Sequence, residues 1–518
     1  MQRRRLLAGS WWMATALALS GPRGIAANLS PRFKRYPFTL GVASGYPTSS
    51  TVVLWTRLAP EPLSPDGGMA PEVVALTYEM ASDESFAHIV QSGTAWAEPD
   101  WAHSVHVDVM GLQPGRPYWY RFRAGDALSP VGRCATAPPA GQMPAKLRIA
   151  VASCQQYEQG YYTAYRHIAE GNTDLVLHVG DYIYESNFNG ERVRQHNSSE
   201  CYSLSDYRLR HSLYRLDANL QAAHAQCPWL LVTDDHEVDN DYAGETSEED
   251  DDPRLFLARR AVAYKAYYEH MPLPRRALPL GPDMRMYASL ACGDLAGFHM
   301  LDSRQYRSPI PCPRPGTRGA NRIYADDCPA LPDTHRTMLG ARQEQWLQAQ
   351  LVTSRARWNL LAQGVVVAQC DEDPGPRERY WTDSWNGYPA ARQRLLESIA
   401  GSKAQNPVVL GGDIHAFVAA DLRLRANDSK SPIVASELVT TGITSRGPDA
   451  QMLAGMAASG PDFVLADGRQ RGYLRLELTP DSLKADLIGM DSVLVPAAPG
   501  RVSRSLVIEN GVKGLQGR

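Results

Sequence analysis

The chain lacks the features that mark a nucleic-acid-binding, membrane or repeat protein. Its 518 residues carry 53 Lys and Arg against 56 Asp and Glu, so the formal net charge is only -3. This balance gives no support to a nucleic-acid partner held by bulk charge. Beyond the first 27 residues, no apolar run is long enough to cross a bilayer and no internal repeat is found. The composition, 44% hydrophobic and 21% charged, is typical of a globular protein, and the length predicts two or more domains.

Residues 1–27 differ in kind from the rest. Arg3 to Arg5 precede the apolar stretch 6–19, and small residues follow at Ala26 and Ala27. This order is typical of an export signal. The paired arginines resemble a twin-arginine signal, although Gln2 stands where a polar residue of another type is usual; the resemblance implies the twin-arginine export machinery as a partner and a periplasmic or secreted protein. A membrane anchor is the alternative, but the apolar run is short and interrupted.

Eight cysteines are present, and an exported protein can keep disulfides. Cys312 and Cys328 flank a loop rich in Pro, Gly and Arg and form the best predicted pair. Cys201 with Cys227 is a weaker pairing. If Cys154 is a metal ligand, an odd number remains and at least one cysteine stays unpaired.

Two regions of different pattern follow the signal. Residues 36–135 contain short strands separated by turns, which predicts a small N-terminal β-sandwich. The Pro/Gly/Ala-rich stretch 136–145 is the expected linker. From 146 to 518, apolar strands alternate with amphipathic helices such as 254–268 and 339–353, which indicates an α/β domain. Its tail, 472–478 and 483–488, returns to a period of two and predicts antiparallel edge strands.

Four loops that follow predicted strands carry residues able to bind metals. Because the carboxyl ends of such strands meet in one crevice, these side chains should converge. Packed carboxylates would repel one another unless cations neutralised them, so two or more metal ions are expected. A phenolate suits a hard cation such as Fe(III). The residues of the four loops are Cys154; Asp181 and Tyr184; Asp234 to Asn240; and Asp413 with His415.

Each loop has a simpler explanation when taken alone. Cys154 could be a buried core thiol and His415 a structural histidine. The pair Asp181 and Tyr184 could cap a loop, and Asp235 could cap a helix. Four such loops in order favour the metal centre. The acidic run 245–252 could bind calcium but is interpreted as a solvated loop.

Three motifs are similar to those of the alkaline phosphatase D family, a branch of the calcineurin-like metallophosphoesterases related in its site to purple acid phosphatases. They are Gly180-Asp181-x-x-Tyr184, Asp234-Asp235-His236-Glu237 and Gly412-Asp413-x-His415. Further segments agree over nearly the whole chain after the signal; one departure is Tyr46, where the family commonly has Asp, and it is not expected to affect the chemistry. The resemblance implies an N-terminal β-sandwich followed by a metallophosphoesterase-type αββα sandwich.

The same resemblance implies a distribution of ligands. Asp181 would bridge two metals, and Cys154, Tyr184 and His415 would hold Fe(3+). Asp235 and Asp413 would lie toward a second site, which in this family looks like Ca(2+). Asn240 is a further candidate there, and Asp234 is the alternative to Asp235.

The expected function is an exported, metal-dependent phosphoesterase that hydrolyses phosphate diesters or monoesters with metal-activated hydroxide. His236 is the candidate general acid; the alternative is that it only orients a ligand. Arg304 is the candidate phosphate-binding residue; the alternative is a salt bridge to Asp302 or another site carboxylate.

Two other functions stay open at this point. One is a non-catalytic exported protein of the cell envelope whose metals are structural and whose β-sandwich binds a partner; shared ligands that leave open coordination positions argue for catalysis instead. The other is a serine-nucleophile phosphatase, for which no serine stands in a zinc-ligand frame.

Overall fold

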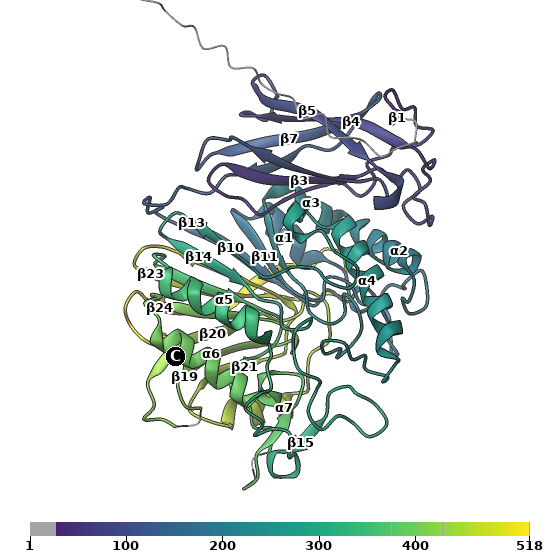
Figure 1. Cartoon of the computed structure of the whole chain (residues 1–518). Coiled ribbons are helices and arrows are strands. Elements are labelled where there is room, and N and C mark those ends of the chain that lie inside the picture. Colours follow the sequence, from purple (N-terminus) through teal and green to yellow (C-terminus); the bar gives the residue numbers. More distant parts are fainter. Residues whose placement is uncertain (1–26, 374, 427, 517–518) are drawn as a thin grey trace, which may run out of the picture.

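The computed structural model describes residues 27–373, 375–426 and 428–516. The predicted export signal therefore lies outside the described residues, apart from Ala27. Within the described part of the chain, no helix combines the length and the apolar character needed to cross a membrane. An N-terminal β-sandwich lies against one end of a larger α/β body (Figure 1).

The N-terminal sandwich has two sheets that share one hydrophobic core. Leu54 of one sheet and Leu76 of the other are both buried in it. The outer sheet contains β1 (Ala27–Asn28), β4 (Val73–Ala81), β5 (Ile89–Ala97), β7 (Pro117–Ala124), β8 (Ala127–Leu128) and β9 (Gly132–Ala135). The inner one contains β2 (Val42–Gly45), β3 (Thr51–Arg57) and β6 (Ser104–Met110).

The inner sheet continues into the α/β body, which the sequence did not predict. β2 pairs with β12 (Trp229–Val232) through one bridge, Gly45 to Trp229. A side chain at Gly45 would meet the Trp229 carbonyl oxygen at 2.9 Å, so only glycine permits this approach. The hydroxyl of Tyr46, the residue that departs from the family pattern, donates to the Leu231 carbonyl at 3.1 Å. Tyr46 thus contacts a strand that leads into the candidate site.

The α/β body contains two sheets packed face to face. The first runs in the order β24-β23-β22-β10-β11-β12 and then into β2-β3-β6, and its central β10 (Leu147–Ala152), β11 (Leu175–Val179) and β12 are parallel. Its far edge is antiparallel, as the tail of the sequence predicted: β22 (Gly472–Leu478), β23 (Ser482–Met490) and β24 (Gly500–Glu509).

The second sheet has the order β13-β14-β16-β18-β20-β19-β21, with a parallel centre. Its strands are β13 (Ala288–Cys292), β14 (Ala296–Met300), β16 (Trp358–Ala362), β18 (Pro407–Gly411), β19 (Phe417–Arg423), β20 (Ile433–Val439) and β21 (Phe463–Asp467).

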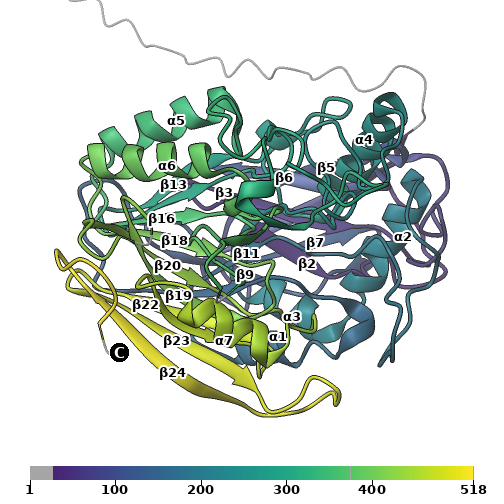
Figure 2. The same cartoon turned by 90° about the horizontal axis from the view of Figure 1, so that it is seen from below.

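Helices cover the two sheets and complete the predicted αββα sandwich (Figure 2). One core joins the first sheet to α1 (Thr163–Glu170), α2 (Leu204–Arg215), α3 (Ala218–Gln226) and α4 (Pro253–His270). A second core joins the other sheet to α5 (Gly340–Thr353), α6 (Pro389–Gly401) and α7 (Ala450–Ala458). α4 begins where Asp252 caps the nitrogen of Arg254 and Pro253 occupies the first turn.

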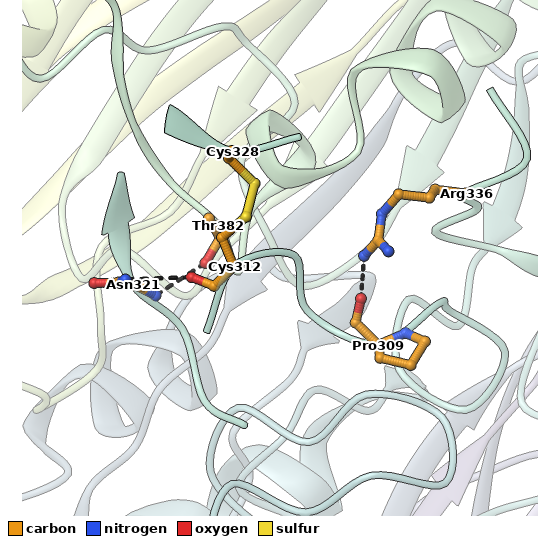
Figure 3. Close-up of a disulfide and its surroundings, with 6 residues drawn as sticks. All are labelled: Pro309, Cys312, Asn321, Cys328, Arg336 and Thr382. Carbon is orange, nitrogen blue, oxygen red and sulfur yellow. Dashed lines mark hydrogen bonds between the residues drawn. A yellow bond between two sulfur atoms is a disulfide. The ribbon is translucent and has the colours of Figure 1, made fainter. Parts of the chain in front are cut away.

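One disulfide, Cys312 to Cys328, closes a loop beside a small two-stranded sheet (Figure 3). This sheet pairs β15 (Arg322–Tyr324) with β17 (Arg379–Trp381). The predicted Cys312–Cys328 pairing is confirmed. The weaker prediction is wrong: Cys201 and Cys227 are both free, buried thiols that pack in the first core.

Candidate metal centre

The predicted ligands lie in loops at the carboxyl ends of parallel strands, on one edge of the two sheets. Four of them have left-handed backbones: φ is 55° at Cys154, 56° at Asp181, 64° at Asp413 and 56° at His415. Non-glycine residues avoid this region, and each such residue costs of order 1 kcal/mol or more. Strain of this kind gathers at functional sites, where the surrounding structure holds it in place.

The first group contains the four residues expected to hold iron. Ligand atoms of Cys154, Asp181 and His415 lie within 4.8 Å of one another. The Tyr184 hydroxyl is 2.9 Å from a carboxylate oxygen of Asp181 and 3.2 Å from Nε2 of His415. Nδ1 of His415 lies 2.8 Å from the Arg446 carbonyl, so it carries the proton and leaves Nε2 free for a cation.

The charge state of this group fits a bound cation. Oδ1 of Asp181 is buried with no hydrogen-bond partner among the described residues. Burial raises the pKa of the Asp181 carboxyl well above its usual range, with the charges of Asp235 and Asp234 adding to the effect. Burial and then the charge of Asp181 likewise raise the pKa of the Cys154 thiol. A cation would supply the missing partner and allow both groups to ionise.

Asp181 also belongs to a second group. Its ligand atoms lie within 4.8 Å of those of Asp235 and His236. One carboxylate shared by two neighbouring groups is the geometry expected of a bridge between two cations. This arrangement supports the bridging role that the resemblance implies for Asp181.

The geometry favours Asp235 over Asp234 as the ligand. One oxygen of Asp234 accepts a hydrogen bond from Nε of Arg304 at 2.5 Å. The Asp234 carboxylate is packed so closely against Gly364 that a Cβ there would lie 2.4 Å from its carboxyl carbon. Asp235 instead takes part in two of the groups.

Arg304 is enclosed by carboxylates. Its side chain is 0% exposed. Nη1 and Nη2 donate to the two oxygens of Asp383, each at 2.8 Å, in a bidentate pair. The contacts are thus those of the salt-bridge alternative, although to Asp234 and Asp383 instead of Asp302. Phosphate binding by Arg304 stays a prediction, and this enclosure weighs against it.

Two acidic residues of the site were missed from the sequence. Asp241 and Asp383 form a third group with Asp235, again within 4.8 Å. Burial raises the pKa of Asp241 to about 7, and the charges of Asp383 and Asp235 act in the same direction. Asp241 follows Asp235 by six residues in one loop, which was a usable signal. Asp383 follows the short strand β17, and no signal in the sequence marked it.

Asp413 and Asn240, which were expected to contribute to the second site, do not belong to any described group of ligand atoms. Asp413 lies among the acidic residues, and burial followed by the charges of Asp234 and Asp383 raises its pKa well above the usual range. Its oxygens belong to none of the described groups. The Asn240 amide donates to Glu248 at 2.8 Å, and its backbone nitrogen donates to Glu185 at 3.1 Å.

His236 is held from two sides. Its Nδ1 lies 2.7 Å from the Glu185 carboxylate, and its ring lies 4.1 Å from that of Tyr184, centre to centre. Burial alone would lower the pKa of His236, but the charges of Glu185, Asp235 and Asp181 outweigh it and raise the pKa. The side chain keeps 17% exposure, so a substrate can reach it.

A further acidic group needs no cation. Glu185, Glu200 and Asp239 bring their oxygens together. Arg259 neutralises it by pairing with Asp239 at 2.7 Å and with Glu200 at 2.8 Å. None of the residues in the acidic run 245–252 belongs to a group of described ligand atoms.

Comparisons with known proteins point to one family. Residues 149–487 match the model of the PhoD-like phosphatase family, and residues 24–138 match its N-terminal domain model. The segment between the two matches overlaps the predicted linker. The chain is 44% identical over 530 residues to alkaline phosphatase D of Bacillus subtilis (strain 168), covering 99% of this chain and 88% of that protein.

A solved structure described as "Structure of PhoD" superposes with a TM-score of 0.89 at 44% identity, covering 94% of this chain and 93% of the other. These findings set aside the non-catalytic binding protein and identify a phosphatase. The chain belongs to the PhoD-like phosphatase family.

Proposed function

We propose that the protein hydrolyses phosphate diesters and monoesters at a centre of two or more cations. The observation that carries this proposal is the sharing of Asp181 between two groups of ligand atoms at the ends of parallel strands. Cations bound there would neutralise ester oxygens and lower the pKa of water toward neutrality.

The donor types differ between the groups and suggest different metals. Cys154, Asp181, Tyr184 and His415 offer a thiolate, a carboxylate, a phenolate and an imidazole, a set that fits Fe(3+). Asp235 belongs both to the group that contains Asp181 and to the group of Asp241 and Asp383, so the second cation would lie among these four carboxylates, whose oxygens suit Ca(2+). Asp413 lies close enough to their charges to contribute, as the resemblance implies.

His236 is the proposed general acid. Because Glu185 accepts from Nδ1, Nε2 is the nitrogen left to face the substrate. When the bond between phosphorus and the ester oxygen breaks, the departing alkoxide takes the proton from Nε2 and leaves as the alcohol. The neutral imidazole is then reprotonated from solvent, and the carboxylates around it favour that charged form.

We also propose the domain limits and the route of the protein. Residues 1–27 would act as a twin-arginine export signal, 36–135 as the β-sandwich domain, 136–145 as the linker and 146–518 as the catalytic domain. A disulfide such as Cys312–Cys328 is stable in an oxidising compartment, which supports a periplasmic or secreted location. Cell fractionation of the full chain, with and without Arg3→Lys and Arg4→Lys, tests the export route; equal export of both forms contradicts it.

Metal analysis of the protein as isolated, without added metals or chelators, tests the centre. We expect about one iron and at least one calcium per chain, and a tyrosinate-to-iron absorption band that Tyr184→Phe abolishes. Two zinc ions, or no metal, would contradict the proposed metals. Turnover of a chromogenic diester that chelators abolish tests the activity separately.

A further inference from the structure

A cavity of about 380 Å³ opens beside the candidate centre. It lies where the loop after β18 meets α7 and the segment after β17. Asp413 and His415 are among the residues that line it. The apolar part of its wall is formed by Val366, Trp381, Ile414, Met452 and Met456.

The apolar wall is built to stay in place. Met456 is buried in the second core, so α7 is anchored to the seven-stranded sheet. Met452, one turn earlier, is half-buried, and its sulfur lies 3.7 Å from a guanidinium nitrogen of Arg322. Arg322 in turn pairs with Glu372 at 2.8 Å. The hydrophobic core therefore fixes Met456, and Arg322 contacts Met452, so both methionines keep their places in the cavity wall.

The cavity has one uncompensated positive charge. Arg446 is exposed and lines the cavity, and its guanidinium donates to the Glu191 carbonyl at 2.8 Å. It also lies over the Phe188 ring at 5.0 Å. Among the described residues it forms no ion pair, whereas Arg304 and Arg322 are both occupied by carboxylates.

Arg446 is tied directly to the centre. Its carbonyl oxygen accepts a hydrogen bond from Nδ1 of His415. The backbone of Arg446 thus orients His415, and its side chain places a guanidinium group at the cavity. A phosphate ester bound at the centre would carry negative charge within this arrangement, and a guanidinium is a strong partner for phosphate oxygens.

We infer that the cavity binds an apolar organic substituent of a phosphate diester and that Arg446 pairs with the ester's negative charge. The inference rests on the proposed function and adds the substrate class. A diester has a second organic group that needs space beside the reacting phosphorus, and a monoester does not. The cavity volume lies in the range of small-molecule sites, about 300 to 1,000 Å³.

The test compares two diesters with one leaving group. Phenyl 4-nitrophenyl phosphate and methyl 4-nitrophenyl phosphate differ only in the group that stays on phosphorus. We expect wild-type kcat/KM to favour the phenyl ester by on the order of 10-fold or more, because each buried apolar group adds to binding. Met452→Glu places a charge in the wall and should bring that ratio close to one. Met452→Leu should retain it.

Controls separate the possible failures. Met110, an exposed methionine of the N-terminal sandwich, gives the matched variant Met110→Glu, which should keep the wild-type ratio. Arg446→Ala should raise KM for both esters, with partial recovery in Arg446→Lys. A wild-type ratio near one, or an unchanged ratio in Met452→Glu, overturns the inference. Absence of metal-dependent turnover of either ester in the wild type would instead overturn the proposed function on which it rests.

Discussion

The carboxylate of Glu185 lies 2.7 Å from Nδ1 of His236, and both residues follow strands of the same sheet. Glu185 stands one position after Tyr184, whose ring lies against that of His236. One loop therefore supplies a candidate metal ligand and the support of the candidate acid. Glu185 acts on chemistry only through the orientation of the imidazole, so it is a positioning residue.

Removal of His236 should separate metal binding from catalysis. We expect His236→Ala to retain iron and to lose turnover of alkyl esters by roughly 100-fold to 10,000-fold. Nitrophenyl esters, whose leaving group needs no proton, should lose much less. Glu185→Gln should lower kcat on alkyl esters with KM nearly unchanged. Unchanged kinetics of His236→Ala on an alkyl ester would exclude the general-acid role.

Asp241 should matter for calcium and not for iron. It lies in the all-carboxylate group with Asp235 and Asp383, apart from the thiolate and phenolate. We expect Asp241→Ala to contain less calcium per chain by elemental analysis, to keep its iron, and to regain activity with added calcium. Asp250→Ala is the matched control, because Asp250 is an acidic residue paired on the surface with Arg318. Loss of iron together with calcium would contradict the division into two sites.

Replacement of Arg304 should unfold the protein more easily. Arg304→Met removes the buried arginine that pairs with Asp234 and leaves Asp383 with Arg307 as its remaining buried partner. Loss of one member of a buried ion pair typically costs about 3 to 5 kcal/mol. Urea unfolding measures this loss. If stability stays at the wild-type level while KM for phosphate esters rises, the phosphate-binding role predicted from the sequence is supported and the structural role is wrong.

The Cys312–Cys328 disulfide should support the all-carboxylate group. Inside the loop that it closes, Ala320 donates to the Asp241 carboxylate at 2.8 Å, and Asn321 bonds to Thr382, the neighbour of Asp383. We expect Cys312→Ser with Cys328→Ser to weaken calcium binding and lower kcat, measured by calcium titration of activity.

Cys292→Ser, which changes a free and half-exposed thiol, is the control for that experiment. Wild-type calcium dependence in the double serine variant would show that the loop keeps its conformation without the disulfide.

A buried histidine should make the fold sensitive to acid. His178 is fully buried, neither ring nitrogen has a partner among the described residues, and burial lowers its pKa to about 3. The folded-state pKa of His178 is depressed below the ordinary 6.5. The stability that the neutral, buried imidazole contributes is therefore fully present above pH 6.5 and is lost as the pH falls toward 3.

His178→Phe should therefore lose less stability than the wild type between pH 7.5 and pH 5, by about 2 kcal/mol. Thermal unfolding at both pH values measures the difference. His88→Phe changes an exposed histidine and should behave as the wild type. Equal acid sensitivity of His178→Phe and the wild type would contradict the prediction.

The sequence was informative where chemistry follows directly from a strand. β10, β11 and β18 are continuous apolar runs that end in polar loops, and parallel strands end on one edge, so Cys154, Asp181 and His415 could be brought together in advance. The α/β class of the domain and its antiparallel tail followed from the same periodicity, whereas the αββα arrangement was implied by the resemblance of the motifs.

Other features depended on the path of long loops. Asp383 reaches the site through β17 and its pairing with β15, which involves only three residues on each strand and leaves little trace in the sequence. The enclosure of Arg304 depends on three loops meeting, and the type of residue alone did not distinguish it from a phosphate-binding arginine. The join between β2 and β12 is a single bridge, too short for any pattern.

The bridge between β2 and β12 has a consequence for the edge of the first sheet that β2 covers. β2 is the neighbour of β12 on this side of the sheet, and without it the backbone of Trp229, at the start of β12, would lose its partners at an open edge. Such edges recruit strands from other molecules and lead to aggregation. A catalytic body separated from the sandwich is therefore expected to self-associate more readily through this edge.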